Sequence, residues 1–303
     1  MRPVLRLGPD RAIVLLRCGA YLCVDLRSID ALPFVFEIDV EPDVIAVFRT
    51  FLRPESVVVD VGANFGLYTA IAGRQLAGRG RLFAFEGNPG VFQCLVRTIA
   101  ANRLWPDPRI SFNNLLVSDR SGRGTIYFTT DALGGGTMSD VPPVGEARQS
   151  ADVAMTSLDD FLPDDVAADL VKIDVEGHEP LVLRGMERTV ERSPNLRLIV
   201  EFSEELLRPT TGAAAFADEI RARGFHICRI LPHGGLELLP PAQSVVGYNN
   251  CLLTRTPERD IAAVEQRRRD PWRRLRRWVR QGPKWAARYG NRWPIDAIAT
   301  VER

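Results

Sequence analysis

Short apolar runs alternate with amphipathic stretches along most of the chain, between residues 42 and 254. The run Val57-Val58-Val59 is apolar without interruption, as is typical of a strand that is covered on both faces. The stretch that opens at Pro42 instead carries its apolar residues at helical spacing and ends near Pro54. Further helices are predicted over residues 67–76, 89–102, 158–162, 179–192 and 213–223. Strands are predicted over residues 57–61, 81–85, 110–117, 170–175, 196–202, 226–231 and 250–254.

Strands that alternate with helices favour an α/β fold, in which a mostly parallel sheet has helices on both faces. Short strands are also expected near the N-terminus, over residues 12–16, 21–26 and 34–38, and a short antiparallel strand over residues 125–129. Residues 131–150 are rich in glycine, proline and serine and predict a loop. We therefore divide the chain into an N-terminal region (1–49), a ligand-binding domain (50–256) and a C-terminal tail (257–303).

Polar residues and glycines follow the first strand of this domain. Gly62 and Gly66 flank a sharp strand-to-helix turn, where glycine tolerates positive φ and lets backbone N–H groups approach a ligand. Asp60 could accept hydrogen bonds from an ammonium group, and Glu86 ends the next strand, where an acid can bind two ribose hydroxyls. The dinucleotide pattern G-x-G-x-x-G is not met, because Asn64 stands at its second glycine. A nucleoside without phosphates fits better, which favours S-adenosylmethionine over NAD.

A second polar cluster follows the strand predicted over residues 170–175. Because ligands bind at the carboxyl ends of parallel strands, this cluster should share one crevice with the first. Asp174, Glu176 and His178 are the candidates for holding an acceptor hydroxyl and removing its proton, and Lys172 could pair with a carboxylate. Glu201, at the end of the next strand, is a weaker candidate that could simply pair with an arginine. His178 could alternatively only cap the helix that follows.

These acids could also bind a metal ion. Because no HxH or HExxH spacing occurs, we predict no metal site.

Several ordered motifs resemble the FkbM family of methyltransferases, over residues 40 to 255. They are Glu41-Pro42, Asp60-Val-Gly-Ala-Asn-Phe-Gly-Leu-Tyr-Thr69, Ala84-Phe-Glu-Gly-Asn-Pro89, Leu158-Asp159, Val171-Lys-Ile-Asp-Val-Glu-Gly-His-Glu179 and Leu183-Arg-Gly185. One departure is Gly87, where the family usually has proline after the acid. It leaves Glu86 itself in place.

The resemblance implies a Rossmann-like class I methyltransferase fold with a seven-stranded sheet that contains one antiparallel strand. It also implies O-methylation, commonly of a sugar hydroxyl on a glycan or of a natural product, as in polysaccharide biosynthesis. It assigns the methionine end of S-adenosylmethionine to Asp60, Gly62, Asn64 and Gly66, with Tyr68, Thr69 and Asp174 beside them. By the same resemblance Glu86 would hold the ribose, and Ser118 and Asp119 would face the adenine. Asp174, Glu176 and His178 would face the methyl group and the acceptor.

Composition changes this picture mainly at the C-terminus. The chain has 303 residues, 46% of them hydrophobic, and a net charge of +1. Residues 265–292 hold eleven Lys or Arg and two acids, which gives this segment +9 and leaves −8 for the rest. An acidic body argues against nucleic-acid binding. Five cysteines without a CxxC pair, and no signal peptide, predict a cytoplasmic protein with reduced thiols.

The tail predicts a short amphipathic helix that starts at Asp270-Pro271 and runs to Gln281. One face would carry Trp272, Leu275, Trp278 and Val279, and the other Arg273, Arg274, Arg276, Arg277 and Arg280. Such a helix could pack on the body through its tryptophans, lie on an anionic membrane surface, or dock on an acidic glycosyltransferase or glycan.

Two other functions stay open at this level. An NAD-dependent sugar oxidoreductase or epimerase is disfavoured by Asn64 and by the lack of a clear Tyr-x-x-x-Lys pair. A non-catalytic binding protein on the same fold would have no need for so many converging carboxylates. The loop 131–150 and the N-terminal strands are expected to shape the acceptor pocket, and the oligomeric state is not readable.

Overall fold

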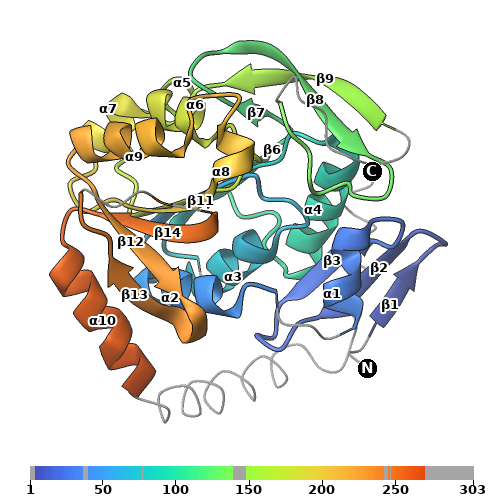
Figure 1. Ribbon diagram of the computed structural model, residues 1–303. Helices are drawn as coiled ribbons and strands as arrows, with labels where there is room; N and C mark the ends of the chain where they lie inside the picture. The colour runs from blue at the N-terminus through green and yellow to red at the C-terminus, as the bar shows by residue number, and fades with distance from the viewer. Residues whose placement is uncertain are drawn as a thin grey trace.

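A computed structural model describes residues 4–36, 40–76, 78–138, 148–241, 245 and 247–269. Its centre is an eight-stranded sheet in the order β13-β12-β14-β11-β10-β4-β5-β6 (Figure 1). The strands β6, β5, β4, β10 and β11 are parallel, and β14 is antiparallel to β11 and β12. The bounds are β4 Val57–Val61, β5 Arg81–Phe85, β6 Ile110–Asn113, β10 Leu170–Ile173, β11 Arg197–Ser203, β12 His226–Leu231, β13 Gly235–Leu238 and β14 Tyr248–Thr254.

This sheet confirms the α/β class and has one strand more than the seven expected. The additional strand is β13, which pairs with β12 at the edge of the sheet. The 3-10 turn Pro232–Gly234 (η2) reverses the chain between the two strands. His233 adopts φ 69° in this turn, which allows the tight reversal.

Neighbouring residues of each central strand point into two different cores. Val58 and Leu82 pack with the helices α2 (Pro42–Phe51), α3 (Leu67–Leu76) and α10 (Pro257–Arg269). Val59 and Phe83 pack on the other face, with α5 (Leu158–Phe161), α6 (Glu179–Arg184), α7 (Glu187–Glu191) and α9 (Ala213–Ala222). Helices therefore cover both faces of the sheet (Figure 1). Burial on both faces explains why the strands are apolar without alternation. Two further described helices follow strands of this sheet: α4 (Pro89–Ala101) after β5, and the short α8 (Glu204–Leu207) after β11.

The N-terminal residues form a separate antiparallel sheet of β1 (Val4–Leu7), β2 (Arg11–Leu15) and β3 (Tyr21–Asp25). It is attached to helix α4 (Pro89–Ala101): the Cys23 N–H donates to Thr98 Oγ1 at 2.8 Å. In the strand expected over residues 34–38, the described residues 34–36 are not extended: they end the helix α1 (Leu32–Val35), which follows the 3-10 turn η1 (Ile29–Ala31), and residues 37 and 38 lie outside the described residues. Proline in the first turn favours this short helix, and Phe34 packs edge-on against Phe65.

A third sheet consists of β7 (Leu116–Val117), β9 (Arg148–Thr156) and β8 (Gly122–Thr129), in that order. The loop expected over residues 131–150 is therefore too long, since β9 already begins at Arg148. The polar first half of β9 is exposed, and its pairing with β8 rather than burial makes it a strand. The strand expected over residues 110–117 is split into β6 and β7.

The helix expected over residues 179–192 is likewise split, into α6 and α7. Gly185 ends α6, and a Cβ there would lie 2.0 Å from the Ser118 carbonyl oxygen. The helix α10 was not expected from the sequence at all, and the helix predicted over residues 270–281 lies outside the described residues. No helix in the described part of the chain is long and apolar enough to span a membrane.

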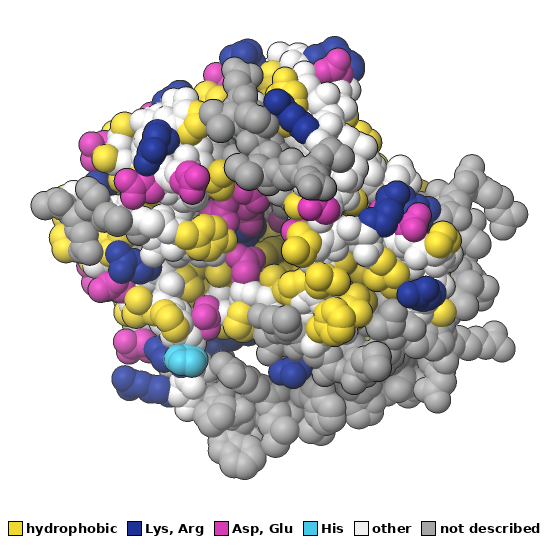
Figure 2. All heavy atoms as spheres, turned by 45° about the vertical axis from the view of Figure 1, so that its right-hand side comes forward, with side chains coloured by type: hydrophobic (Ala, Val, Ile, Leu, Met, Phe, Trp, Pro, Cys, Tyr) yellow, Lys and Arg dark blue, Asp and Glu magenta, His cyan; other side chains and the backbone are white. Residues whose placement is uncertain are grey.

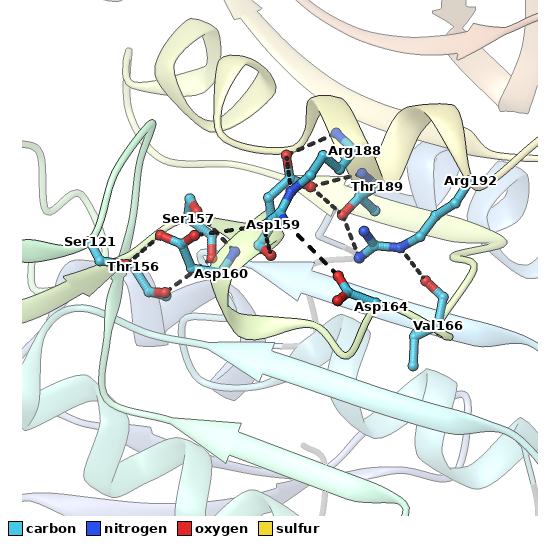
Figure 3. A network of polar contacts seen from close by, with 10 residues as sticks. All are labelled: Ser121, Thr156, Ser157, Asp159, Asp160, Asp164, Val166, Arg188, Thr189 and Arg192. Atoms are coloured by element: carbon cyan, nitrogen blue, oxygen red, sulfur yellow. Dashed lines mark hydrogen bonds and ion pairs between the residues drawn. The ribbon is translucent and has the colours of Figure 1, made fainter.

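Asp159, from the Leu158-Asp159 motif, holds the start of α7 (Figure 3). Its carboxylate accepts the backbone N–H of Arg188 at 2.9 Å and that of Thr189 at 2.7 Å. The Thr189 hydroxyl donates to the same carboxylate at 2.7 Å. The N-cap of α7, Met186, has no side-chain cap, so Asp159 supplies from another segment what a local Ser or Asp would usually supply.

We expect the Asp159→Ala change to lower the free energy of unfolding by about 2 kcal/mol, because two N–H groups of α7 lose their acceptor. Urea denaturation would measure this. The matched control is Asp164→Ala, whose side chain is 89% exposed and lies 4.0 Å from Arg188. It should change stability by less than about 0.5 kcal/mol. Equal losses in both variants would show that Asp159 is not a cap.

Candidate active site

The turn after β4 is closed against the segment that follows β10. Gly62 has φ 77°, and a Cβ built there would lie 1.8 Å from the Asp174 carbonyl oxygen. Gly66 has φ 93°, and its Cβ would lie 2.7 Å from Leu95 Cδ1 on α4. The sequence suggested that these glycines make room for a ligand. In the structure the atoms that approach them belong to the protein itself, and Gly62 brings the two polar clusters together.

Glu86 lies at the carboxyl end of β5 and organises both neighbouring turns. Its Oε2 accepts the Asn64 N–H at 2.8 Å, and its Oε1 accepts the Asn88 N–H at 2.7 Å. Asn64 adopts φ 50°, a left-handed conformation that asparagine tolerates better than most residues. Burial raises the pKa of Glu86 to about 7, although the two N–H groups favour its charged form. Each carboxylate oxygen retains a lone pair for a further donor.

Asp60 is buried below Gly62 and is half satisfied. Thr69 Oγ1 donates to Asp60 Oδ2 at 2.5 Å, whereas Oδ1 has no hydrogen-bond partner among the described residues. Burial raises the pKa of Asp60 to about 6. Tyr68, next to Thr69 on α3, donates its hydroxyl to Glu41 Oε2 at 2.8 Å. Tyr68 and Thr69, which the sequence assigned to the cofactor, thus direct their hydroxyl groups to Glu41 and Asp60.

Three carboxylates converge at the ends of β10 and β11. One oxygen each of Asp174, Glu176 and Glu201 lies within 4.8 Å of the other two. Lys172 is buried below them and donates to Asp174 Oδ2 at 2.6 Å, so the predicted pairing of this lysine is confirmed. Burial alone would lower the pKa of Lys172, but the carboxylates of Asp174 and Glu41 raise it, which keeps the lysine charged.

Burial and mutual repulsion raise the pKa of two of these acids. The pKa of Glu176 rises to about 8, and that of Glu201 to about 9. The Tyr248 side chain partly offsets this rise at Glu201, and no arginine of the kind that the sequence suggested is among the described contacts of Glu201. Acids from the start of α2 (Glu41), the loop after β10 (Asp174 and Glu176) and β11 (Glu201) therefore make this crevice electronegative.

The loop that carries Asp174 and Glu176 is held by side chains that hydrogen-bond its backbone. Glu176 has φ 53°, and the Thr137 hydroxyl donates to its carbonyl oxygen at 2.8 Å. The buried Glu179 carboxylate accepts the N–H groups of Val175 at 3.0 Å and Gly177 at 3.3 Å. A left-handed backbone conformation is unfavourable for a non-glycine residue, and these hydrogen bonds stabilise it at Glu176. The backbone conformation in turn sets the direction of the Glu176 side chain.

His178 has surroundings that differ from those of the other two predicted catalytic residues. Its Nε2 lies 3.0 Å from Ser118 Oγ, and Ser118 also donates to Asp119 Oδ1 at 3.1 Å. Burial lowers the pKa of His178 to about 4, and the charges that act on it are those of Asp119 and Arg120. The structure thus groups His178 with Ser118 and Asp119, and Asp174 with Glu176 and Glu201.

Reading the sequence missed several contributors to this crevice. Glu41 was noted only as part of a motif, yet its Oε1 also accepts from Asn250 Nδ2 at 3.0 Å. Asn250 is paired with Glu201 in the register of β14 and β11. Asp30 accepts the Gly134 N–H at 2.8 Å and adds to the negative charge around Glu176. No sequence spacing signals Tyr248, Asn250 or Asp30, because only the folded chain brings them together.

Figure 2 shows acidic side chains gathered in a hollow on this face, with hydrophobic side chains around it. The residues present fit S-adenosylmethionine. Among the described residues, one buried oxygen of Asp60 has no hydrogen-bond partner, and Glu86 offers a carboxylate already oriented by two backbone N–H groups. When bound, the cofactor supplies an electrophilic methyl group on a sulfonium.

Three solved structures illustrate what the fold is similar to. TYW2 of M. jannaschii in complex with AdoMet is 12% identical, with 83% of this chain and 87% of that chain covered and a TM-score of 0.40. TYW2 of P. horikoshii in complex with MeSAdo is 17% identical, with 82% and 71% covered and a TM-score of 0.38. Precorrin-6y C5,15-methyltransferase of Geobacter metallireducens is 12% identical, with 72% and 87% covered and a TM-score of 0.38. No curated protein matches the chain.

The family model of the methyltransferase FkbM domain matches residues 60–227, which is more than half of the chain. This stretch begins at Asp60, contains Glu86, Asp174 and Glu176, and ends in β12. The match decides against the NAD-dependent oxidoreductase and the non-catalytic protein that the sequence left open. The chain belongs to the FkbM methyltransferase family, and it is an enzyme that uses S-adenosylmethionine as its cofactor.

Proposed function

We propose that this enzyme methylates a hydroxyl group of a sugar, on a glycan, a glycolipid or a glycosylated natural product. The observation that carries the proposal is the group of three carboxylates beside the cofactor half of the crevice. Carboxylates hydrogen-bond the hydroxyl groups of a neutral polyol, and one of them can take the proton that the acceptor loses.

The charge of the crevice bears on which acceptor is suited to it. Asp174, Glu176 and Glu201 carry three negative charges when ionised, and Lys172 offsets one of them. An acceptor carboxylate would meet this negative field, which disfavours carboxyl methylation. A neutral hydroxyl meets no such repulsion.

The crevice has a cofactor half, with Glu86, Ser118 and Asp119, and an acceptor half, with Asp174 and Glu176. Glu86 would accept hydrogen bonds from the ribose hydroxyls, and Ser118 and Asp119 would face the adenine. Asp174 or Glu176 would hold the acceptor oxygen and accept its proton, while Lys172 orients Asp174 through its hydrogen bond to Oδ2. His178, neutral above pH 5, would orient the Ser118 hydroxyl instead of acting as the base.

The test is methyl transfer to a panel of neutral glycosides, uronic acids and amino sugars, followed by S-adenosylhomocysteine release and NMR of the product. An O-methyl ether on a neutral sugar supports the proposal, and a methyl ester or N-methyl product contradicts it. With an active acceptor, Glu176→Gln should lower kcat about 100-fold or more at unchanged cofactor affinity. The matched control Glu191→Gln, an exposed residue of α7, should retain wild-type kcat.

Cofactor binding should depend on pH through Glu86, whose pKa is about 7. The ionised carboxylate accepts hydrogen bonds from both ribose hydroxyls, whereas the protonated form has one acceptor fewer. The affinity for S-adenosylhomocysteine should therefore rise from pH 6 to pH 8 and then level off, by at most about tenfold per pH unit below pH 7.

Calorimetric titrations across this range would measure the effect. Glu86→Gln, which does not titrate, should bind more weakly and show a smaller step around pH 7. The remaining step below pH 7 belongs to Asp60, whose pKa is about 6. An unchanged step in Glu86→Gln would assign the whole pH dependence to another group.

A further inference from the structure

Two neighbouring strand ends place three carboxylates around one point. β10 and β11 are parallel, and Ile173 is paired with Val200 in their register. Asp174 follows Ile173 and Glu201 follows Val200, so both acids lie at the same edge of the sheet. Glu176 joins them because the left-handed turn of its backbone returns the loop toward this edge.

Glu201 gives an independent sign that a ligand belongs here. It is only 5% exposed. Its buried Oε2 has no hydrogen-bond partner among the described residues. A buried carboxylate oxygen without a partner is unfavourable unless a cation or a hydrogen-bond donor meets it.

When all three carboxyl groups are ionised, as a bound cation would favour, the cluster leaves room for two positive charges. Lys172 offsets one of the three carboxylates through its 2.6 Å contact with Asp174. Glu179 is buried nearby and adds further negative potential at Glu176 and Glu201. A single ammonium group would leave one charge of the cluster uncompensated, whereas a divalent cation would compensate both.

The spacing of the oxygens also suits such an ion. Two oxygens on opposite sides of a cation are separated by twice the bond length, which is about 4.2 Å for Mg²⁺ and about 4.6 to 5.2 Å for Ca²⁺. The three oxygens lie within 4.8 Å of one another. We propose that Asp174, Glu176 and Glu201 form a binding site for a divalent, oxygen-preferring cation such as Mg²⁺, Mn²⁺ or Ca²⁺.

This proposal departs from the expectation that the chain has no metal site. That expectation relied on missing histidine spacings, which are typical of zinc sites. Hard cations instead bind carboxylates, which need no fixed sequence spacing because different strands can supply them. Asp174 and Glu201 are 27 residues apart in the sequence and meet only through strand pairing.

Three protein ligands would leave positions open for water or an acceptor hydroxyl. A hydroxyl bound there would have a lowered pKa, so that its proton passes more readily to a nearby carboxylate before transfer. Its oxygen would then bond to the methyl carbon while the carbon–sulfur bond breaks and its electron pair stays on sulfur. This role rests on the proposed function, whereas cation binding itself does not.

The experiment uses the full chain, freed of metal with EDTA and desalted, and titrated with Mn²⁺ while EPR reports the free ion. We expect one site per chain, with affinity at least tenfold weaker in Glu201→Gln and in Glu176→Gln, and unchanged in Glu191→Gln. Absence of Mn²⁺ binding, or equal binding in all variants, would overturn the proposal. If Glu201→Gln does not fold, as judged by circular dichroism, the half-buried Glu176→Gln decides alone.

Two further measurements separate this proposal from the proposed function. Binding of S-adenosylhomocysteine and methyl transfer without any Mn²⁺ binding would overturn the cation site alone. Mn²⁺ binding without methyl transfer to any sugar would overturn the sugar acceptor and leave the cation site. Displacement of Mn²⁺ by Mg²⁺ or by Ca²⁺ would identify the ion. If an amino sugar binds and Mn²⁺ does not, the cation site is overturned and the carboxylates are assigned to an amine acceptor.

Discussion

Glu86→Ala is expected to lower the affinity for S-adenosylhomocysteine by at least about 100-fold in calorimetric titrations. Glu86 would accept two hydroxyl groups of the ribose, and hydrogen bonds to a charged group contribute about 1.5–3 kcal/mol each. Two of them correspond to at least about 3 kcal/mol, which is more than a hundredfold in affinity. The carboxylate also positions Asn64 and Asn88, so the turns around the cofactor lose their shared acceptor.

Two controls make this result interpretable. Glu191→Ala removes an exposed glutamate of α7 and should bind S-adenosylhomocysteine like the wild type. A thermal melt of Glu86→Ala should show a folded protein, because the lost contacts concern two loop N–H groups and no core side chain. Affinity within about threefold of wild type in a folded Glu86→Ala protein would remove Glu86 from the cofactor site.

Gly62→Ala is expected to lower the free energy of unfolding by at least about 4 kcal/mol and to abolish methyl transfer. Part of the loss comes from φ 77°, which costs a residue with a Cβ about 1–2 kcal/mol. The larger part comes from the new Cβ, which would lie 1.8 Å from the Asp174 carbonyl oxygen. That oxygen cannot move freely, because the Asp174 N–H is bound to Val61 O at 3.0 Å.

Gly8→Ala separates the two causes. Gly8 has a nearly identical φ of 75°, but a Cβ there meets nothing within 4 Å. This variant should lose only the conformational part, about 1–2 kcal/mol, in the same urea titration. If Gly62→Ala loses no more than Gly8→Ala, the close approach between the two halves of the site is wrong.

The regular alternation of strands and helices could be predicted because it depends on local periodicity. Strands such as Val57–Val61 and Arg81–Phe85 are buried on both faces, so their apolar runs are unmistakable. Predictions failed where strand pairing or the start of a helix determines the local structure. Strand β9 is polar and exposed at its start and exists through its pairing with β8. Residues 34–36 are apolar, yet they end a short helix that has proline in its first turn.

The candidate site divides in the same way, into residues that local patterns mark and residues that only tertiary contacts bring in. Asp60, Glu86, Asp174 and Glu176 could be named in advance as candidates, because acids at or just beyond the ends of buried parallel strands lie at the carboxyl edge of the sheet. The role of Asp159 could not be foreseen, since its partners Arg188 and Thr189 belong to another helix. A motif in the sequence marks that a residue is constrained, but not whether a ligand or a helix end constrains it.

By itself, the sequence determined the fold class, the family and the carboxylates at the strand ends, because each depends on residues that are close together along the chain. Only the tertiary structure decided how those carboxylates are grouped. Strand pairing brought Glu201 beside Asp174 and gave Lys172 its partner, while His178 was directed to Ser118. Such groupings depend on contacts between segments far apart in sequence, and these contacts are set by the packing of the whole sheet rather than by any local pattern.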